Sequence, residues 1–191
     1  MKNQLFDLTK KVSLITGGNG GIGLGMAKGL ASCGSDIAII GRNIEKNSKA
    51  KEELSEFDVR VETYSIDVSN EEDVKKTVLN VVNDFGRIDA VFANAGMNLY
   101  GGSFEDMDTD VYRKVLAVNL DGVFFTLREV CKHMVERAKK GDPGGSIVGV
   151  ASLAGIEGAA KTQPYSASKG GIRAIIKAVS YTHLRAHETC L

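Results

Sequence analysis

Short apolar segments alternate with segments of helical length along most of the chain, and this alternation limits the possible folds more than any other feature. The apolar segments are rich in β-branched residues and read "KVSLIT" (11–16), "DIAII" (36–40), "VRVETYSI" (59–66), "IDAVFA" (88–93) and "SIVGVAS" (146–152). Such runs are typical of strands buried on both faces. Helices are predicted at 21–33, 44–56, 70–84, 109–139 and 164 to about 180. Repeated alternation of this kind predicts a parallel sheet with right-handed crossovers, in a doubly wound α/β domain.

Length, charge and cysteine usage narrow the function classes. A chain of 191 residues fits one domain with a real core. Its 24 basic and 24 acidic residues cancel, which argues against a nucleic-acid or membrane partner and favours a small molecule. No apolar run has the length of a membrane span or of a secretory leader, and the three cysteines form no C-x-x-C pair. These features predict a soluble, cytoplasmic protein with reduced thiols.

A glycine-rich loop, "TGGNGGIG", connects the first predicted strand to the first predicted helix. Gly17, Gly21 and Gly23 stand at the spacing G-x-x-x-G-x-G, with Asn19 and Ile22 between them. Glycines at such a turn let backbone N–H groups approach a pyrophosphate at the positive end of the helix. The alternative interpretation is a plain turn with close helix packing, and the flanking strand and helix favour nucleotide binding.

The second predicted strand ends in "IIGRN". Where dinucleotide folds place an acid for the ribose 2′-hydroxyl, this chain has Gly41, followed by Arg42 and Asn43. The nearby acid Asp36 stands at the beginning of the strand, away from the ligand end. An arginine suits a phosphate, so the sequence predicts a preference for NADP(H) over NAD(H), with NAD(H) still possible. The alternative is a solvated arginine at the start of a helix.

The stretch "TQPYSASKGG" places Tyr165 and Lys169 one helical turn apart. Residues i and i+4 share a helix face, and a nearby cation favours the ionised form of a phenol. Tyr165 is therefore a candidate general acid and base, with Lys169 as its electrostatic partner. Gly170 and Gly171 weaken a helix, so we expect them to allow close approach of a neighbouring backbone. The alternative interpretation is a half-buried tyrosine beside a surface lysine.

With these residues assembled, the chain resembles the short-chain dehydrogenase/reductase family over roughly residues 7–180. The "TGGNGGIG" loop matches the cofactor loop of that family. Further matches to its cofactor-binding positions are Asp67, Val68, Asn94, Ala95 and Gly96. Matches to its catalytic positions are Asn119, Ser152, Tyr165 and Lys169. Each residue alone has an ordinary explanation as a cap or turn former, whereas their combination in family order is specific.

The resemblance implies the architecture and the chemistry. It implies a Rossmann-type sheet of strand order 3-2-1-4-5, with the last two strands of the family missing, and an enzyme that interconverts a secondary alcohol and a ketone. Tyr165 would move the proton, Ser152 would bond the substrate oxygen, Lys169 would also bond the nicotinamide ribose, and Asn119 would hold a relay water. In a full-length version, the helices at 109–139 and 164–180 would form homodimers or homotetramers.

The end of the chain departs from this pattern. Residues 1–180 are expected to form the dinucleotide-binding domain. The segment "YTHLRAHETCL" (181–191) is expected to be an anomalous tail, either an artefact or an extension of the helix. Truncation would leave the fifth strand as an unprotected edge. His183 and His187 have i, i+4 spacing without an evident third ligand, so we predict no metal site.

Two other functions remain compatible with these motifs. A chain that lacks the last strands of its family could be a non-catalytic nucleotide-binding fragment. Sugar-nucleotide epimerases and dehydratases of the extended type share Y-x-x-x-K, although their glycine loop is usually G-x-x-G-x-x-G. Hydride exchange with ketones, as opposed to redox-neutral rearrangement of a nucleotide sugar, separates these enzymes.

Overall fold

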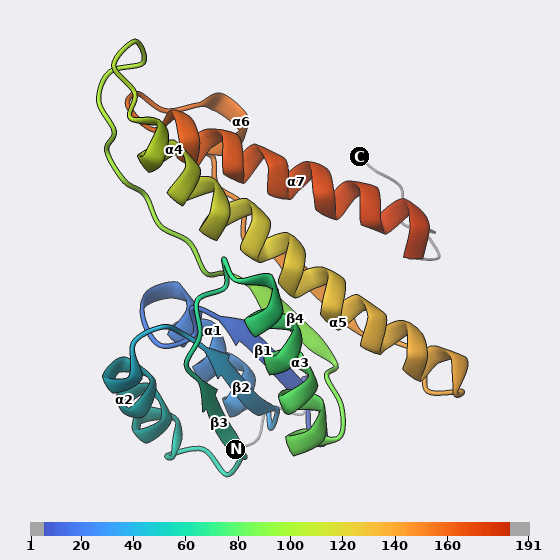
Figure 1. The fold of residues 1–191 in the computed structure, drawn as a ribbon. Helices are drawn as coiled ribbons and strands as arrows, with labels where there is room; N and C mark the ends of the chain where they lie inside the picture. The colour runs from blue at the N-terminus through green and yellow to red at the C-terminus, as the bar shows by residue number, and fades with distance from the viewer. Residues whose placement is uncertain (1–5, 184–191) are drawn as a thin grey trace.

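The computed structural model describes residues 6–183, which form a parallel sheet between two layers of helices (Figure 1). The strands are β1 (Val12–Thr16), β2 (Asp36–Ile40), β3 (Val61–Tyr64), β4 (Ala90–Ala93) and β5 (Ser146–Gly149). Their order in the sheet is β3-β2-β1-β4-β5, and every neighbouring pair is parallel. The predicted doubly wound α/β fold and its strand order are confirmed.

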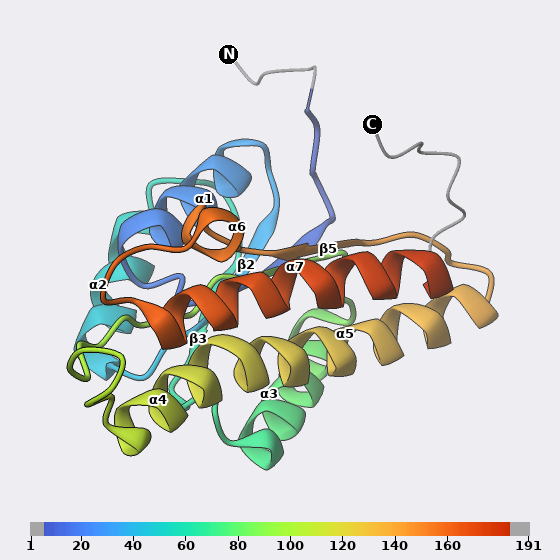
Figure 2. The ribbon, with the colours of Figure 1, turned by 90° about the horizontal axis from the view of Figure 1, so that it is seen from above.

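Helices cover both faces of the sheet. The helices are α1 (Gly21–Ser32), α2 (Ile44–Leu54), α3 (Glu71–Phe85), α4 (Thr109–Leu116), α5 (Gly122–Lys139), α6 (Ala154–Glu157) and α7 (Gln163–His183). One face packs against α1 and α2, and the other packs against α3, α5 and α7. Seen from above, α5 and α7 lie side by side (Figure 2). Within the described residues, no helix is long and apolar enough to cross a membrane.

Polar side chains cap the first turns of three of these helices. Asn43, Asn70 and Asp108 cap α2, α3 and α4, each accepting a hydrogen bond from a main-chain N–H of the first turn. At the other end of α3, Gly86 adopts a φ of 80°, the left-handed conformation that ends helices. The first helix differs, because it begins after Gly20 without a side-chain cap. Its first N–H groups are therefore left for another partner.

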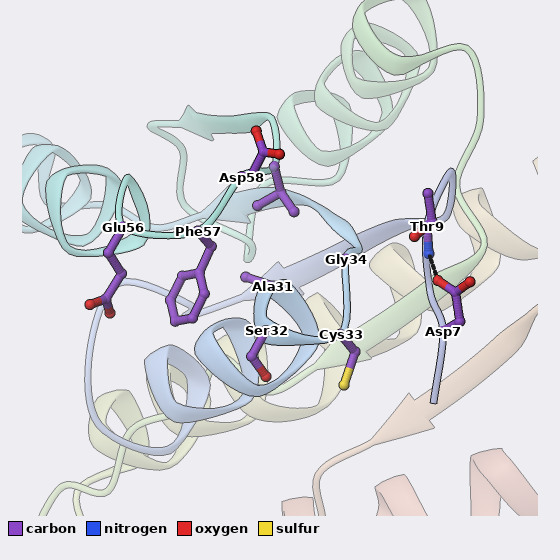
Figure 3. A pocket seen from close by; sticks show the side chains of 10 residues that line it. Asp7, Thr9, Ala31, Ser32, Cys33, Gly34, Glu56, Phe57 and Asp58 are labelled. Carbon is purple, nitrogen blue, oxygen red and sulfur yellow. Dashed lines mark hydrogen bonds between the residues drawn. The ribbon is translucent and has the colours of Figure 1, made fainter. Parts of the chain in front are cut away.

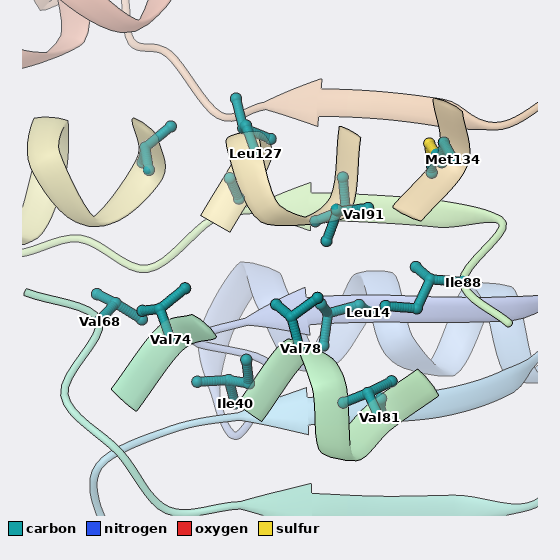
Figure 4. Close-up of a cluster of buried hydrophobic side chains, with 14 of the residues drawn as sticks. Leu14, Ile40, Val68, Val74, Val78, Val81, Ile88, Val91, Leu127 and Met134 are labelled. Carbon is teal, nitrogen blue, oxygen red and sulfur yellow. The ribbon is translucent and has the colours of Figure 1, made fainter. Parts of the chain in front are cut away.

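The larger core cluster fills the space between the sheet and α3, α5 and α7 (Figure 4). Leu14 of β1 and Val91 of β4 are fully buried there against Val74 of α3 and Leu127 of α5. On the opposite face, Ile15, Ile37 and Ile39 pack against α1 and α2. Because alternate residues of the central strands enter two different cores, β1 and β2 carry the continuous apolar runs seen in the sequence.

The two edge strands correct the prediction that every strand is buried on both faces. Val61 is the one buried residue of β3, with 7% of its surface exposed, and β5 has no buried residue. Among the described residues β5 pairs with β4 alone, as expected for an edge. Both strands are also shorter than the predicted segments 59–66 and 146–152. The first and last residues of β3 and β5 are those that pair with β2 and β4, and the apolar composition of the sequence does not show where this pairing stops.

The predicted helix at 109–139 is interrupted. Residues Ala117–Asp121 form a π-helical segment between α4 and α5. A π-helical turn inserts an extra residue and changes the direction of the side chains that follow. Gly122, which follows the segment, allows close approach to Val68, because a Cβ there would lie 2.8 Å from the Val68 Cγ2 atom. The periodicity of a sequence does not reveal such an insertion.

A buried ionic cluster ties α5 to the amino ends of β1 and β4. The Asp89 carboxylate accepts hydrogen bonds from the Val12 main-chain N–H at 3.0 Å and from Arg87 Nη2 at 2.6 Å. Arg137 Nη2 lies 3.5 Å from the same carboxylate, and Arg137 Nη1 donates to the Ile88 carbonyl at 2.7 Å. Burial raises the pKa of Asp89, but these hydrogen bonds and cations outweigh it and hold that pKa below its ordinary value.

His133 lies beside this cluster and also holds α5 against β4. Its Nε2 atom accepts a hydrogen bond from the Ile88 main-chain N–H at 3.2 Å, so this nitrogen carries no proton. Burial and the positive charge of Arg137 lower the pKa of His133, whereas Asp89 and Asp142 act in the opposite direction. The folded protein therefore favours neutral His133.

We expect His133 to make the protein less stable in mild acid. The unfolded chain binds a proton at an ordinary histidine pKa of about 6.5, so the stabilisation is present above that pH and is lost as the pH falls below it. His133→Gln keeps an acceptor and cannot titrate. Urea unfolding between about pH 7.5 and 5.5 should show a shallower pH dependence for the variant than for the wild type. Identical pH dependences would contradict the assignment.

Candidate active site

A cleft of about 540 Å³ opens at the carboxyl ends of β1 to β4, and we call it the carboxyl-end cleft. All cofactor-binding residues predicted from the first part of the chain line it, namely Gly17, Asn19, Gly21, Ile22, Gly23, Arg42, Asn43, Asp67, Val68, Asn94, Ala95 and Gly96. Lys46, Met97 and Val118 also line it and were not predicted. Lys46 follows Arg42 by four residues, in the first turn of α2, and this spacing could have indicated from the sequence that it lines the cleft.

The glycine loop crosses directly over the end of β4. Gly17 has a φ of 65°, and a Cβ on Gly23 would lie 2.3 Å from the Gly17 carbonyl oxygen and 2.6 Å from Asn94 Nδ2. The Asn94 amide donates to the carbonyls of Thr16 at 3.1 Å and Gly17 at 3.3 Å. This bracing aims the uncapped start of α1 into the cleft. Free N–H groups at a helix start bind anions such as phosphate.

Arg42 and Asp67 form an ion pair at the rim of the cleft. Arg42 Nη1 lies 3.2 Å from Asp67 Oδ2, and Ser69 donates to Asp67 Oδ1 from its N–H at 3.0 Å and its hydroxyl at 2.7 Å. Burial raises the pKa of Asp67, but the hydrogen bonds from Ser69 and Arg42 outweigh it and lower that pKa. Asp67 is therefore a carboxylate at neutral pH.

The inner end of the cleft brings Asn119 and Lys169 together around Gly96. A Cβ on Gly96 would lie 3.4 Å from Asn119 Oδ1 and 3.5 Å from Lys169 Nζ. Asn119 is fully buried in the π-helical segment, where its amide exchanges two 2.8 Å hydrogen bonds with the Met97 backbone and donates to Ser168 Oγ at 3.2 Å. Both N–H groups of this amide are thus in use.

Lys169 is buried on α7 and faces the exit of β5. Its ammonium donates to the Val150 carbonyl at 2.6 Å and lies 5.8 Å from the centre of the Tyr165 ring. Burial lowers the pKa of Lys169. Within residues 6–183, no hydrogen bond involves the Tyr165 hydroxyl. The two side chains share one side of α7, as the i, i+4 spacing predicted.

Ser152 lies beyond the end of β5, in the turn before α6, and not within the strand as predicted. Its Oγ accepts a hydrogen bond from the Ala154 N–H at 3.3 Å. The turn is held against α7 because a Cβ on Gly170 would lie 3.1 Å from the Gly155 carbonyl oxygen. The expected close approach of backbone is therefore present at Gly170, whereas at Gly171 the near neighbour is the Leu120 side chain.

A second cavity, of about 480 Å³, lies at the amino ends of the strands (Figure 3). Figure 3 shows Asp7 and Thr9 on one side of it and Glu56, Phe57 and Asp58 on the other. In doubly wound sheets ligands bind at the carboxyl ends, so the carboxyl-end cleft is the candidate site. No group of three metal-binding side chains occurs among the described residues, and His187 lies outside them.

A family model described as "short chain dehydrogenase" matches residues 11–186. Sorbose reductase sou1 of Schizosaccharomyces pombe is 32% identical over 180 residues, which cover 92% of this chain and 69% of that protein. The NADP-dependent (R)-specific alcohol dehydrogenase of Lentilactobacillus kefiri is 35% identical over 173 residues, covering 91% and 66%. Across such curated relatives, the chain spans between 62% and 70% of their length.

Solved structures show the same likeness. A crystal structure of NAD⁺-bound xylitol dehydrogenase matches with a TM-score of 0.87 and 36% identity, covering 92% of this chain and 65% of the other. A metagenomic short-chain oxidoreductase in complex with NADP matches with a TM-score of 0.84 and 28% identity, covering 92% and 77%.

We expect Gly23→Ala to disrupt the glycine loop, because the added methyl group collides with the Gly17 carbonyl. The free energy of unfolding of the variant, measured by urea titration, should be lower by about 1–3 kcal/mol. The variant should also bind adenine dinucleotides weakly. Gly29→Ala in the same helix is the control, since its Cβ meets no atom within 4 Å. This control should be stabilised by about 0.5–1 kcal/mol. Equal stability and dinucleotide affinity in the two variants would contradict the close approach.

Proposed function

The chain belongs to the short-chain dehydrogenase/reductase family of oxidoreductases, and from this premise we propose that it interconverts a secondary alcohol and a ketone with NADP(H). The observation that carries the proposal is the meeting of Asn119 and Lys169 at Gly96, where the carboxyl-end cleft ends. Tyr165 adjoins Lys169 there. A dinucleotide cleft that leads to a buried cation beside a phenol suits redox chemistry with proton transfer.

The residues of the cleft fit a dinucleotide. The uncapped start of α1 and the glycine loop would hold its pyrophosphate, and Asp67 and Val68 would adjoin its adenosine half. Asn94, Ala95 and Gly96 would line its path towards Tyr165 and Lys169. When bound, such a cofactor supplies hydride chemistry, and the protein supplies orientation and electrostatics.

We assign the proton transfer to Tyr165. In the reducing direction its hydroxyl donates a proton to the ketone oxygen, and in the oxidising direction its phenolate takes a proton from the alcohol. The Lys169 ammonium lies 5.8 Å from the centre of the Tyr165 ring and would also bond the ribose hydroxyls of the cofactor. A hydroxyl group from Ser152 would bond the substrate oxygen. The Asn119 side chain would position the backbone at Met97. A relay water would hydrogen-bond to the Asn119 main chain or to the remaining lone pair on Asn119 Oδ1.

The preference for NADP(H) rests on the end of β2. Arg42 lines the cleft there, and Gly41 takes the place of the acid that would select NAD(H). Asp36 lies at the far end of the strand, where its carboxylate accepts a hydrogen bond from the Arg60 N–H at 2.8 Å. It is therefore not the missing acid. The relatives include users of either cofactor. The alcohol dehydrogenase of Lentilactobacillus kefiri is NADP-dependent, and the crystal structure of xylitol dehydrogenase has NAD⁺ bound.

Tyr165→Phe should lower kcat for secondary alcohols and ketones by roughly 10²–10⁴-fold, because the proton donor is lost. The Kd for NADPH, measured by fluorescence titration, should change less than about twofold, since the ring remains. Tyr181→Phe is the matched control on the same helix, where Tyr181 is 67% exposed. Retention of most of the activity in Tyr165→Phe would refute the assignment.

NADP(H) binding without turnover of any ketone by the wild-type chain would instead favour the non-catalytic alternative. The chain spans about two thirds of the length of these relatives. The binding and turnover measurements on the wild type therefore come first. They separate a nucleotide-binding chain from an enzyme without any substitution.

We also propose that two copies associate through α5 and α7. An apolar groove of about 330 Å³ lies between these helices and is lined by Phe124, Leu127, Cys131, Val135, Ile147, Ile175 and Val179, with Arg128, Lys132 and Glu136 at its polar positions. Exposed apolar patches of this kind mark protein interfaces. The homodimer or homotetramer implied by the family resemblance would bury it.

Val135→Lys should shift the protein to monomers, because the new ammonium would be buried in the proposed interface without a partner. Sedimentation velocity at several protein concentrations measures the change. Leu79→Lys, on the exposed face of α3, is the control and should assemble as the wild type does. A wild-type chain that is monomeric at all concentrations would contradict the proposal.

A further inference from the structure

We propose that Lys46 is a specificity-determining residue that supplies the main cation for the 2′-phosphate of NADP(H). This inference rests on the proposed function and extends it, because sequence and resemblance pointed to Arg42 alone. Three observations at the end of β2 support it. They concern the free ammonium of Lys46, the paired guanidinium of Arg42 and the crowded space around Gly41.

Lys46 is placed in the cleft by the start of α2. The Asn43 side chain caps this helix and accepts a hydrogen bond from the Lys46 main-chain N–H at 2.8 Å. Lys46 is exposed and lines the carboxyl-end cleft. Within residues 6–183, no carboxylate lies within 4.0 Å of its ammonium. Its positive charge is therefore uncompensated at a wall of the cleft.

Arg42 differs, because its charge is already paired. The Arg42 guanidinium bonds the Asp67 carboxylate at 3.2 Å, and that carboxylate is held ionised by Ser69. The pair directs the guanidinium but contributes little net positive charge to a phosphate. A phosphate monoester carries about −1.5 to −2 charges at neutral pH. The remaining positive charge at this end of the cleft comes from Lys46.

Gly41 excludes the alternative form of recognition. A Cβ at this position would lie 2.3 Å from Asn19 Nδ2 and 2.6 Å from Asn47 Oδ1. These two amides bond each other at 2.6 Å, and Asn47 Nδ2 also bonds the Gly41 carbonyl at 2.9 Å. A side chain at residue 41 would have to displace these amides, and the glycine itself offers no carboxylate to the ribose 2′-hydroxyl. Recognition of the 2′ position by cations fits these contacts better than recognition by an acid.

Nucleotide fragments test this inference without requiring turnover. Isothermal titration calorimetry would measure the Kd of adenosine 2′,5′-bisphosphate and of 5′-AMP for the wild type, Lys46→Gln and Lys49→Gln. Lys49 is an exposed lysine on the same helix that does not line the cleft, so its variant is the matched control for charge. Thermal melting of each variant confirms that it folds.

We expect Lys46→Gln to weaken adenosine 2′,5′-bisphosphate roughly tenfold, the loss of one charge-assisted hydrogen bond. Binding of 5′-AMP should change less than about twofold, and Lys49→Gln should bind both fragments as the wild type does. Equal effects of Lys46→Gln and Lys49→Gln, with the bisphosphate still preferred over 5′-AMP, would overturn the role of Lys46 and leave the proposed NADP(H) preference standing. If the wild type bound neither fragment, both proposals would fall.

Discussion

The approach of Gly23 to the Gly17 carbonyl is the contact on which the rest of the structure depends. It allows α1 to start directly above the end of β1, and Asn94 fixes that arrangement to the end of β4. Strand β1 is central in the sheet, with β2 on one side and β4 on the other. The chain connections diverge at this point, and a cleft opens where neighbouring loops run in opposite directions. A larger residue at 23 would separate these elements.

The site has two halves with different electrostatics. At the rim, Arg42 and Asp67 form an ion pair that is exposed to solvent, so it adds little to the stability of the fold. At the inner end, Lys169 has lost most of its contact with water and holds the Val150 carbonyl. Charges out of water act more strongly on their neighbours. The exposed rim thus suits reversible binding of a charged ligand. At the inner end, the buried Lys169 ammonium is held in place beside the Tyr165 ring.

Local patterns predicted most of the fold and the glycine loop, and the family resemblance added Asp67, Val68 and the residues 94–96 that line the cleft. Contacts between distant residues account for what both missed. Apolar runs located all five strands, and the runs of β1 and β2 correspond to strands that are buried on both sides. Glycine spacing located the loop, since its backbone geometry depends on adjacent residues. Nothing local signals that Asn47 reaches back to Asn19, or that Asn119 bonds Met97. The exposed faces of β3 and β5 follow from sheet order, which composition does not encode.

The π-helical segment Ala117–Asp121 joins both halves of the site. Asn119 bonds Met97 and Ser168, Leu120 packs on Gly171, and Gly122 next to it touches Val68. A helix turns about 100° per residue, so loss of one residue here would rotate all of α5 relative to the sheet. Deletion or insertion of a residue here would therefore disturb both halves of the site at once, whereas surface loops tolerate changes in chain length.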